Sequence, residues 1–459
     1  MNKCMLLGGA AAVLTFASGA QGADQAPPGE VLLLHELVEG VSAERIEADI
    51  TKLVSFGTRH TLSETESDTR GIGAARRWIF EEFERISRDC GGCLDVFYVS
   101  DFVEGENRIP ERTEIVNVVA VQRGRLDPDR YVLMSGDIDS RISDPLNGVD
   151  DSPGANDNAS GMAGTIEAAR VLSQHRFAGS IVYAGLSGEE QGLFGGRILA
   201  RHALDNGWRI KAVLNNDMIG NIAGIDGVID NTVARVFSEG TRAVETEREA
   251  RIRRFTGGEV DSPSRNIARY VERMAHQYVP NLDVMMIYRL DRFGRGGHHR
   301  PFNEVGIPGV RIMETHEHYD RQHQDLRTEN GIAYGDVLEG VNFDYARKLT
   351  ALNVVSLAGM AGAPPFPADV EIEGAVQPST TLRWSRASGR EARNLAGYEV
   401  CWRLTTEAQW TNCRFVGDVG EFTLENIVID NYFFGVASVA RDGSRSPVVF
   451  PGPAGSFGE

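Results

Sequence analysis

The chain has 459 residues and a formal net charge of −18 at pH 7, because 65 acidic residues outnumber 47 lysines and arginines. This excess argues against a nucleic-acid partner, since proteins hold phosphate backbones with clustered basic side chains. The acidic balance suits a soluble, exported protein.

Residues 1–23 are predicted to be a secretory signal peptide. A short start with one lysine precedes an apolar run that ends near Phe16, and small residues follow up to position 23. The run is too short to remain as a membrane anchor, and no other stretch of the sequence is apolar for long enough to span a bilayer. We therefore expect a secreted or periplasmic mature chain without a membrane anchor.

Cysteine usage agrees with export. The sequence has five cysteines, and one of them, Cys4, lies in the predicted signal peptide. An even number then remains, which favours disulfides in an exported chain, and we expect the pairs Cys90–Cys93 and Cys401–Cys413. Half of a zinc site or a redox motif is the alternative for Cys90 and Cys93, but no second cysteine pair lies near them in the sequence.

Residues 41–88 are predicted to form two helices. Ile46 and Ile50 belong to one apolar stripe, and Ala74 and Trp78 belong to a second one after a break rich in Gly, Thr and Ser. Strands are predicted at residues 95–99, 114–121 and 284–288, and a further helix at residues 264–277. Alternation of strands and helices is typical of an α/β protein.

Three apolar runs, at residues 131–134, 180–187 and 212–216, are predicted to be buried strands that end in carboxylates. The carboxylates are Asp137 and Asp139 after the first run, Glu189 and Glu190 after the second, and Asp217 after the third. A loop after the first run carries Asp157 and leads into a helix that Asn158 or Ser160 could cap. Open α/β sheets bind ligands at such strand ends, and so many carboxylates require cations nearby.

The segments 157–161 (DNASG), 188–192 (GEEQG) and 216–220 (NDMIG) resemble, in order and spacing, the signature of the co-catalytic zinc peptidases. That family includes bacterial leucyl aminopeptidases, glutamate carboxypeptidases and, more distantly, glutaminyl cyclases. The resemblance implies an α/β domain over residues 30–362, with a mixed, mostly parallel sheet sandwiched by helices.

The resemblance also implies a role for each site residue. Asp157 would bridge two divalent metal ions, Glu190 and His323 would complete one ion, and Asp137 and Asp217 would bind the other. Glu189 would be the general base and then the acid that protonates the leaving amine. His323 is selected by its position just before residues 325–331, with His318 as the alternative and His316 as a rim residue.

The chain departs from the family's pattern at two positions. Asp137 stands where the family has a histidine ligand, and His298 stands where it has an aspartate. Asp139 would orient the residue at position 137. The expected cofactor is two zinc ions, although an additional oxygen ligand would also suit manganese, and the first metal position could be weak or empty.

Residues 363–368 form a Pro-rich linker, and residues 369–459 contain short predicted strands at regular spacing. This part resembles a fibronectin type III module, which is an all-β sandwich. Cys401 and Cys413 would then bridge two adjacent strands. We expect a packing or spacer role for the module.

Together these features predict an exported metallo-exopeptidase that acts on peptides, most simply an aminopeptidase. The alternatives are carboxypeptidase-like or glutaminyl cyclase-like chemistry on the same fold. A third alternative is a binding protein whose catalytic site has decayed. Its only support is that Asp137 and His298 depart from the family's pattern. The sequence indicates no oligomeric state.

Overall fold

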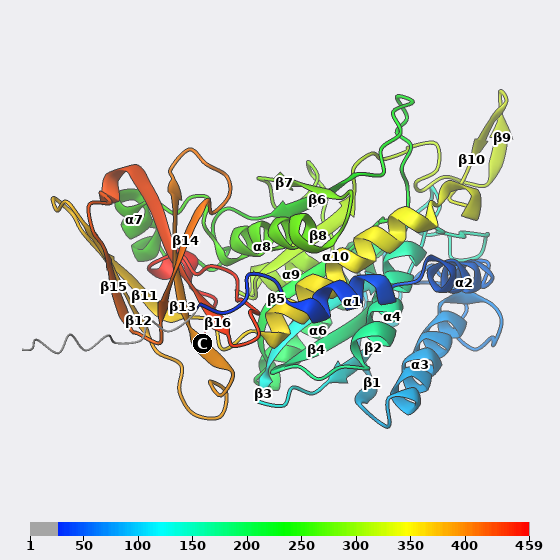
Figure 1. Ribbon diagram of the computed structural model, residues 1–459. Helices are drawn as coiled ribbons and strands as arrows, with labels where there is room; N and C mark the ends of the chain where they lie inside the picture. The colour runs from blue at the N-terminus through cyan, green and yellow to red at the C-terminus, as the bar shows by residue number, and fades with distance from the viewer. Residues whose placement is uncertain (1–25, 459) are drawn as a thin grey trace, which may run out of the picture.

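A computed structural model describes residues 26–458, so the predicted signal peptide lies outside the described residues. The centre of the molecule is an eight-stranded sheet with the strand order β1-β2-β4-β3-β5-β8-β6-β7. Its strands are β1 (Leu94–Val103), β2 (Thr113–Gln122), β3 (Asp127–Asp137), β4 (Gly179–Leu186), β5 (Arg209–Asn216), β6 (Val233–Ser238), β7 (Asp283–Ile287) and β8 (Gly309–Glu314). Figure 1 shows this sheet between helices.

The middle of the sheet is parallel. Strand β3 pairs in parallel with both β4 and β5, and β5 pairs in parallel with β8. Strands β1, β2 and β6 supply the antiparallel pairings. The predicted mixed, mostly parallel sheet is therefore confirmed, and the carboxyl ends of β3, β4, β5 and β8 lie at one edge.

Successive residues of each strand point to opposite faces of the sheet, and each face has its own core. Val132 and Met134 pack in the larger core, whereas Leu133 packs in the smaller one. The larger core lies under α1 (Leu32–Gly40), α2 (Ala43–Val54), α3 (Gly71–Asp89), α4 (Ala159–Leu172), α8 (Pro263–Tyr278) and α10 (Phe343–Gly362). The smaller core lies under α6 (Phe194–Asp205) and α9 (His299–Glu304).

Several elements differ from the sequence predictions. Helix α1 and strands β6 and β8 were not predicted, and the last helix of the α/β domain, α10, begins at Phe343. Residues 327–334, which precede this helix, form a small hairpin of β9 (Arg327–Glu329) and β10 (Ile332–Tyr334). The other short elements are α5 (Glu189–Gly192), α7 (Glu247–Thr256) and the 3₁₀ turns Leu338–Gly340, Ile429–Asn431 and Pro453–Gly455.

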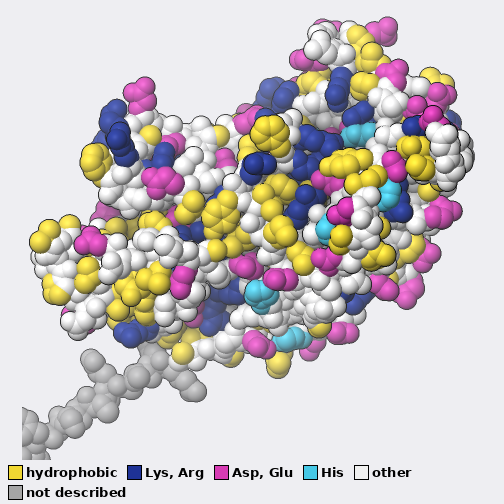
Figure 2. All heavy atoms as spheres, turned by 90° about the horizontal axis from the view of Figure 1, so that it is seen from above, with side chains coloured by type: hydrophobic (Ala, Val, Ile, Leu, Met, Phe, Trp, Pro, Cys, Tyr) yellow, Lys and Arg dark blue, Asp and Glu magenta, His cyan; other side chains and the backbone are white. Residues whose placement is uncertain are grey.

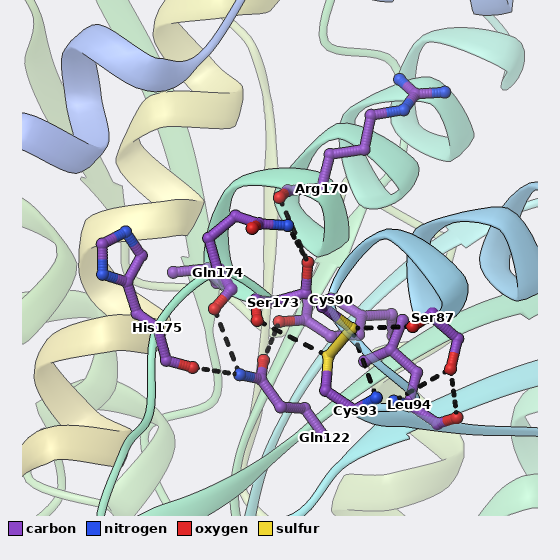
Figure 3. The surroundings of a disulfide bond; sticks show 11 residues. Ser87, Cys90, Cys93, Leu94, Gln122, Arg170, Ser173, Gln174 and His175 are labelled. Atoms are coloured by element: carbon purple, nitrogen blue, oxygen red, sulfur yellow. Dashed lines mark hydrogen bonds between the residues drawn. A yellow bond between two sulfur atoms is a disulfide. The ribbon is translucent and has the colours of Figure 1, made fainter.

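Both predicted disulfides are present. Cys90–Cys93 joins the end of α3 to the start of β1, and Ser87 reinforces this turn by donating a hydrogen bond to the carbonyl of Leu94 over 2.8 Å (Figure 3). Cys401–Cys413 joins two directly opposed residues of neighbouring strands.

The C-terminal part consists of two three-stranded antiparallel sheets. One contains β11 (Ala368–Glu373), β12 (Thr380–Ser385) and β15 (Glu421–Leu424), and the other contains β14 (Asn412–Gly417), β13 (Leu395–Leu404) and β16 (Tyr432–Ala440). The all-β character predicted for this part is confirmed. Figure 1 shows it beside the carboxyl half of the α/β domain.

The two parts are joined by buried ionic contacts. Asp261, just before α8, accepts hydrogen bonds from Arg269 on α8 over 2.8 Å and from Arg403 on β13 over 2.7 Å, and all three side chains are buried. The linker is also held, because Arg130 donates to the carbonyl of Ala363 over 2.8 Å. Among the described residues, no helix combines the length and the apolar character needed to cross a membrane.

Candidate metal centre

The predicted acidic crevice forms at the carboxyl edge of the sheet. Asp137 is the last residue of β3, Glu189 and Glu190 open the short helix α5 after β4, and Asp217 follows β5. Because β3, β4 and β5 are parallel neighbours, these carboxylates converge from separate parts of the sequence. Gly188 makes the turn into α5 possible, since its φ of 75° is strained for residues with a Cβ.

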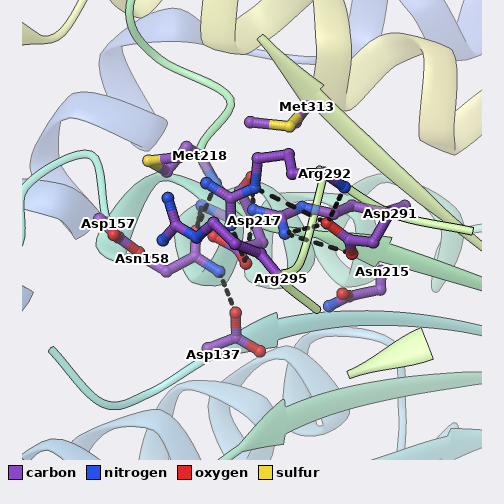
Figure 4. A network of polar contacts seen from close by, with 12 residues as sticks. Asp137, Asp157, Asn158, Asn215, Asp217, Met218, Asp291, Arg292, Arg295 and Met313 are labelled. Carbon is purple, nitrogen blue, oxygen red and sulfur yellow. Dashed lines mark hydrogen bonds and ion pairs between the residues drawn. The ribbon is translucent and has the colours of Figure 1, made fainter. Parts of the chain in front are cut away.

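Asn158 ties the loop that carries Asp157 to the strand ends (Figure 4). Its side-chain oxygen accepts from the backbone N–H of Gly161 over 3.0 Å, which caps α4 as predicted. Its amide nitrogen donates to the carbonyl of Asn216 over 2.7 Å and to Asp137 Oδ2 over 2.6 Å. One amide group thus fixes the relative positions of β3, β5 and α4.

Asp157, Glu190 and His323 come together around one point. His323 Nε2 lies 2.9 Å from Asp157 Oδ2 and 2.8 Å from Glu190 Oε1. The ligand atoms of all three residues lie within 4.8 Å of one another. Two carboxylates and one imidazole with a side open to a cavity form a donor set that suits a catalytic zinc ion. These residues therefore fit one of the two predicted metal positions.

Arg141 holds two residues of the metal-binding group, Glu190 and His323, in place. This role was not predicted from the sequence. Arg141 Nε donates to Glu190 Oε2 over 2.6 Å, and its Nη2 lies 2.7 Å from His323 Nδ1. The guanidinium thus contacts two of the three residues from the side that faces away from their meeting point. The only sequence signal was its place four residues after Asp137, in a loop that carries many acidic residues.

Asp139 has a different role from the one expected. It accepts from the backbone N–H of Glu189 over 3.2 Å and from that of Glu190 over 3.1 Å, and Thr61 donates to it over 3.1 Å. A carboxylate at a helix N-terminus is favourable because the first N–H groups have no partner within the helix. Asp139 therefore positions the backbone of the two glutamates. The residue that hydrogen-bonds to Asp137 is Asn158, and not Asp139 as expected.

Glu189 lines the same cavity as Glu190 and His323. Shielding from water raises the pKa of Glu189 well above its ordinary value, and the nearby carboxylates of Asp217 and Glu190 raise it further. A carboxyl group with a raised pKa, beside a metal-binding group, is suited to accept and return a proton near neutral pH.

The second predicted metal position is not assembled in the same way. Within the part of the chain that the structure describes, no group of three converging ligand atoms includes Asp137 or Asp217. Asp217 Oδ2 instead lies 2.7 Å from Nη2 of Arg311, which is fully buried and is also held by Asp291 over 3.1 Å. A guanidinium thus already neutralises the carboxylate that would bind this ion.

Asp137 is also engaged by protein groups. Its Oδ1 lies 2.6 Å from His298 Nδ1, and its Oδ2 accepts from Asn158. Burial lowers the pKa of His298 to about 4 and raises the pKa of Asp137 to about 8, so the imidazole is neutral near pH 7 and shares a hydrogen bond with the carboxyl group. The two departures from the family's pattern therefore contact each other. The residues at this position do not fit a second ion.

The other histidines considered as ligands lie outside the group. The His316 carbonyl accepts from the Asn221 side chain, and His318 lines a small pocket on the far side of Asp157. His323 is the one of the three whose imidazole reaches both carboxylates.

The chain resembles curated proteins along nearly its whole length. It is 43% identical to a "probable zinc metalloprotease" of Leptosphaeria maculans over 92% of this chain and 97% of that protein. It is 40% identical to a protein of the same description from Pyricularia oryzae, over 90% of this chain and 83% of that one.

Solved structures share the fold of the α/β domain. The LapA aminopeptidase of Legionella pneumophila superposes with a TM-score of 0.51 at 20% identity, covering 72% of both chains. LapB of the same organism gives a TM-score of 0.51 at 19% identity, over 73% of this chain and 77% of that one. Residues 117–339, which carry all the predicted ligands, match the model of peptidase family M28. With relatives this similar over nearly its full length, the protein belongs to peptidase family M28.

Proposed function

We propose that the protein is an exported, zinc-dependent aminopeptidase. The observation that carries the proposal is the meeting of Asp157, Glu190 and His323 beside a cavity whose wall contains Glu190, His323 and Glu189. The relatives that are described as probable zinc metalloproteases support zinc as the metal, and the fold shared with the LapA aminopeptidase supports an aminopeptidase. The two disulfides support export, because such bonds persist in oxidising compartments.

Different residues of the chain have different roles in the proposed hydrolysis. A zinc ion held by Asp157, Glu190 and His323 would supply Lewis-acid activation of water and of the peptide carbonyl. Glu189 takes a proton from the attacking water and returns it to the leaving amine. Asp139 holds the backbone of both glutamates, and Arg141 keeps Glu190 and His323 in place. The buried pair of Arg311 and Asp217 adds a fixed dipole at the edge of the site.

An assay of the purified mature chain tests the proposal against its alternatives. An aminopeptidase releases the aniline from a leucyl anilide and leaves the N-acetylated compound intact. A carboxypeptidase instead cleaves an N-blocked dipeptide, and a cyclase converts a glutaminyl peptide without adding water. A decayed site does none of these. Chelation with a zinc-binding agent should stop the reaction, and added zinc should restore it.

A further inference from the structure

The cavity beside the candidate metal centre is strongly basic. It has a volume of about 320 Å³, and Glu189, Glu190 and His323 form part of its wall. The basic side chains that line it are Arg108, Arg141, Arg197, Arg295 and Arg300. Five guanidinium groups therefore face two carboxylates, in a chain whose net charge is −18. Figure 2 shows one face of the molecule on which Lys and Arg side chains (dark blue) gather beside histidines (cyan).

Two of these arginines serve the metal centre itself. Arg141 contacts Glu190 and His323, and Arg108 donates to the carbonyl of Glu190 over 2.6 Å. Their positions are explained by these contacts. The remaining three, Arg197, Arg295 and Arg300, make no hydrogen bond or ion pair with the proposed ligands within residues 26–458. Arg295 acts on them only through its charge, which helps to lower the pKa of Asp157.

The charges of these three arginines are weakly compensated. Within residues 26–458, Arg197 makes no ion pair and lies over the ring of Phe194 at 5.2 Å. Arg295 comes no closer than 3.9 Å to Glu317. Arg300 lies 3.4 Å from Glu304, one turn along α9, in a half-exposed pair. Ion pairs of this kind contribute little, so all three guanidinium groups keep donors for a ligand.

The fold brings the three arginines to the cavity from two segments. Arg197 lies on α6, whereas Arg295 and Arg300 lie in and after the loop that leads into α9. A Cβ at Gly296 would lie 2.7 Å from Arg300 Nη1, so the glycine leaves room for this guanidinium group. Guanidinium groups bind carboxylates with paired N–H donors, and a cavity with charge of one sign attracts ligands of the opposite sign.

We propose that the substrate carries a carboxylate, which Arg197, Arg295 and Arg300 bind beside the bond to be cleaved. This inference rests on the proposed peptidase function and adds the substrate class. The carboxylate has two sources in a peptide. It is either an acidic side chain at the N-terminus or the free C-terminus of a very short peptide.

Calorimetric titration of the Glu189→Gln variant separates these sources, since binding is then measured without turnover. Glu-Leu-amide is compared with Gln-Leu-amide, and Leu-Leu with Leu-Leu-amide. We expect one carboxylate compound to bind about tenfold more tightly than its neutral partner. The pair that shows this difference identifies the source.

Two triple variants, made in the same Glu189→Gln background, locate the effect. The first variant combines Arg197→Gln, Arg295→Gln and Arg300→Gln. It should bind the carboxylate peptide no more than about twofold more tightly than the neutral partner. The control replaces Arg88, Arg251 and Arg386, which are exposed at 66%, 70% and 54% and lie outside the cavity. It removes the same charge and should keep the preference.

Equal binding of carboxylate and neutral peptides, no binding of any peptide, or an equal loss in the control variant would overturn the proposal. Failure of the proposed function shows separately, as absence of hydrolysis by the wild-type chain. The two failures are therefore distinguishable.

Discussion

The guanidinium of Arg311 lies 2.7 Å from the carboxylate of Asp217, and both side chains are buried at the carboxyl edge of the sheet. Burial alone would lower the pKa of Arg311, but Asp217 and Asp291 raise it on balance, so the guanidinium stays charged. This cation occupies the place at Asp217 where the motif resemblance implies a second metal ion.

The ion pair between Arg311 and Asp217 predicts that each chain holds one zinc ion tightly. His323→Ala should lose this ion, because it removes the only imidazole of the group. Asp217→Asn should keep it, since Asp217 contacts Arg311 instead. Elemental analysis after dialysis against a weak chelator measures both. Two ions in the wild type and one in Asp217→Asn would show that Asp217 is a ligand after all.

Asp139 is expected to affect turnover through the glutamates that it positions. Asp139→Ala leaves the backbone N–H groups of Glu189 and Glu190 without their acceptor. Loss of such a supporting contact costs about 10–100-fold in activity or metal affinity. Asp139→Asn keeps one acceptor oxygen and should recover part of the loss. Steady-state kinetics with a leucyl anilide should show the change in kcat rather than in KM. An unchanged kcat in Asp139→Ala would argue that α5 needs no such support.

The buried contact between the two parts of the molecule should contribute to stability. Asp261→Asn leaves Arg269 and Arg403 buried beside a neutral group, at a cost of about 3–5 kcal/mol. The matched control is Asp418→Asn, which breaks a half-exposed pair with Arg386 in the C-terminal module and should cost far less stability. Urea unfolding measures the free energy of unfolding of both variants. Similar losses in the two would refute a stabilising role for the buried contacts of Asp261. Activity of the folded Asp261→Asn chain on a small anilide should remain, because no proposed ligand lies in the module.

Glu314 gives a prediction for pH dependence. Burial raises the pKa of this carboxyl from 4.5 to about 8, although Asn156 and the backbone of Asn221 donate to it. The folded chain then keeps a proton that the unfolded chain releases, so this group lowers stability as pH rises from 4.5 to 8. Each pKa unit corresponds to about 1.4 kcal/mol.

Glu314→Gln removes this titration and keeps a group of similar shape. The variant should match the wild type near pH 5 and should become the more stable of the two as pH approaches 8. Urea midpoints at several pH values provide the measurement. A constant difference between the two chains over this range would contradict the raised pKa.

Sequence reasoning succeeded where local pattern determines the structure. Apolar runs bounded by polar loops located β3, β4 and β5, and the cysteine spacing located both disulfides. It failed at β6 and β8, because each strand contains an arginine that breaks the apolar pattern. Arg235 on β6 and Arg311 on β8 are accommodated by acidic partners, Glu317 and Asp217, that are remote in the sequence.

In the site, too, local sequence pattern predicted some residues, whereas others depend on contacts between distant parts of the chain. The motifs indicated Asp157 and Glu190, but the partners of the remaining residues depend on tertiary contacts. Arg141 and His323 are 182 positions apart, and Asp137 and His298 are 161 apart. No periodicity or spacing encodes such pairs, so the engagement of Asp137 by His298 became visible only in the folded chain.

The metal content and turnover of Glu189→Gln separate the role of Glu189 as proton carrier from a role in holding zinc. Glu189 shares the cavity wall with the metal-binding group but is not itself among the three converging residues. The variant should bind as much zinc as the wild type and lose about 10²–10⁴-fold in kcat on a leucyl anilide, because the proton carrier is removed. Near-normal turnover with full zinc content would contradict the role as proton carrier.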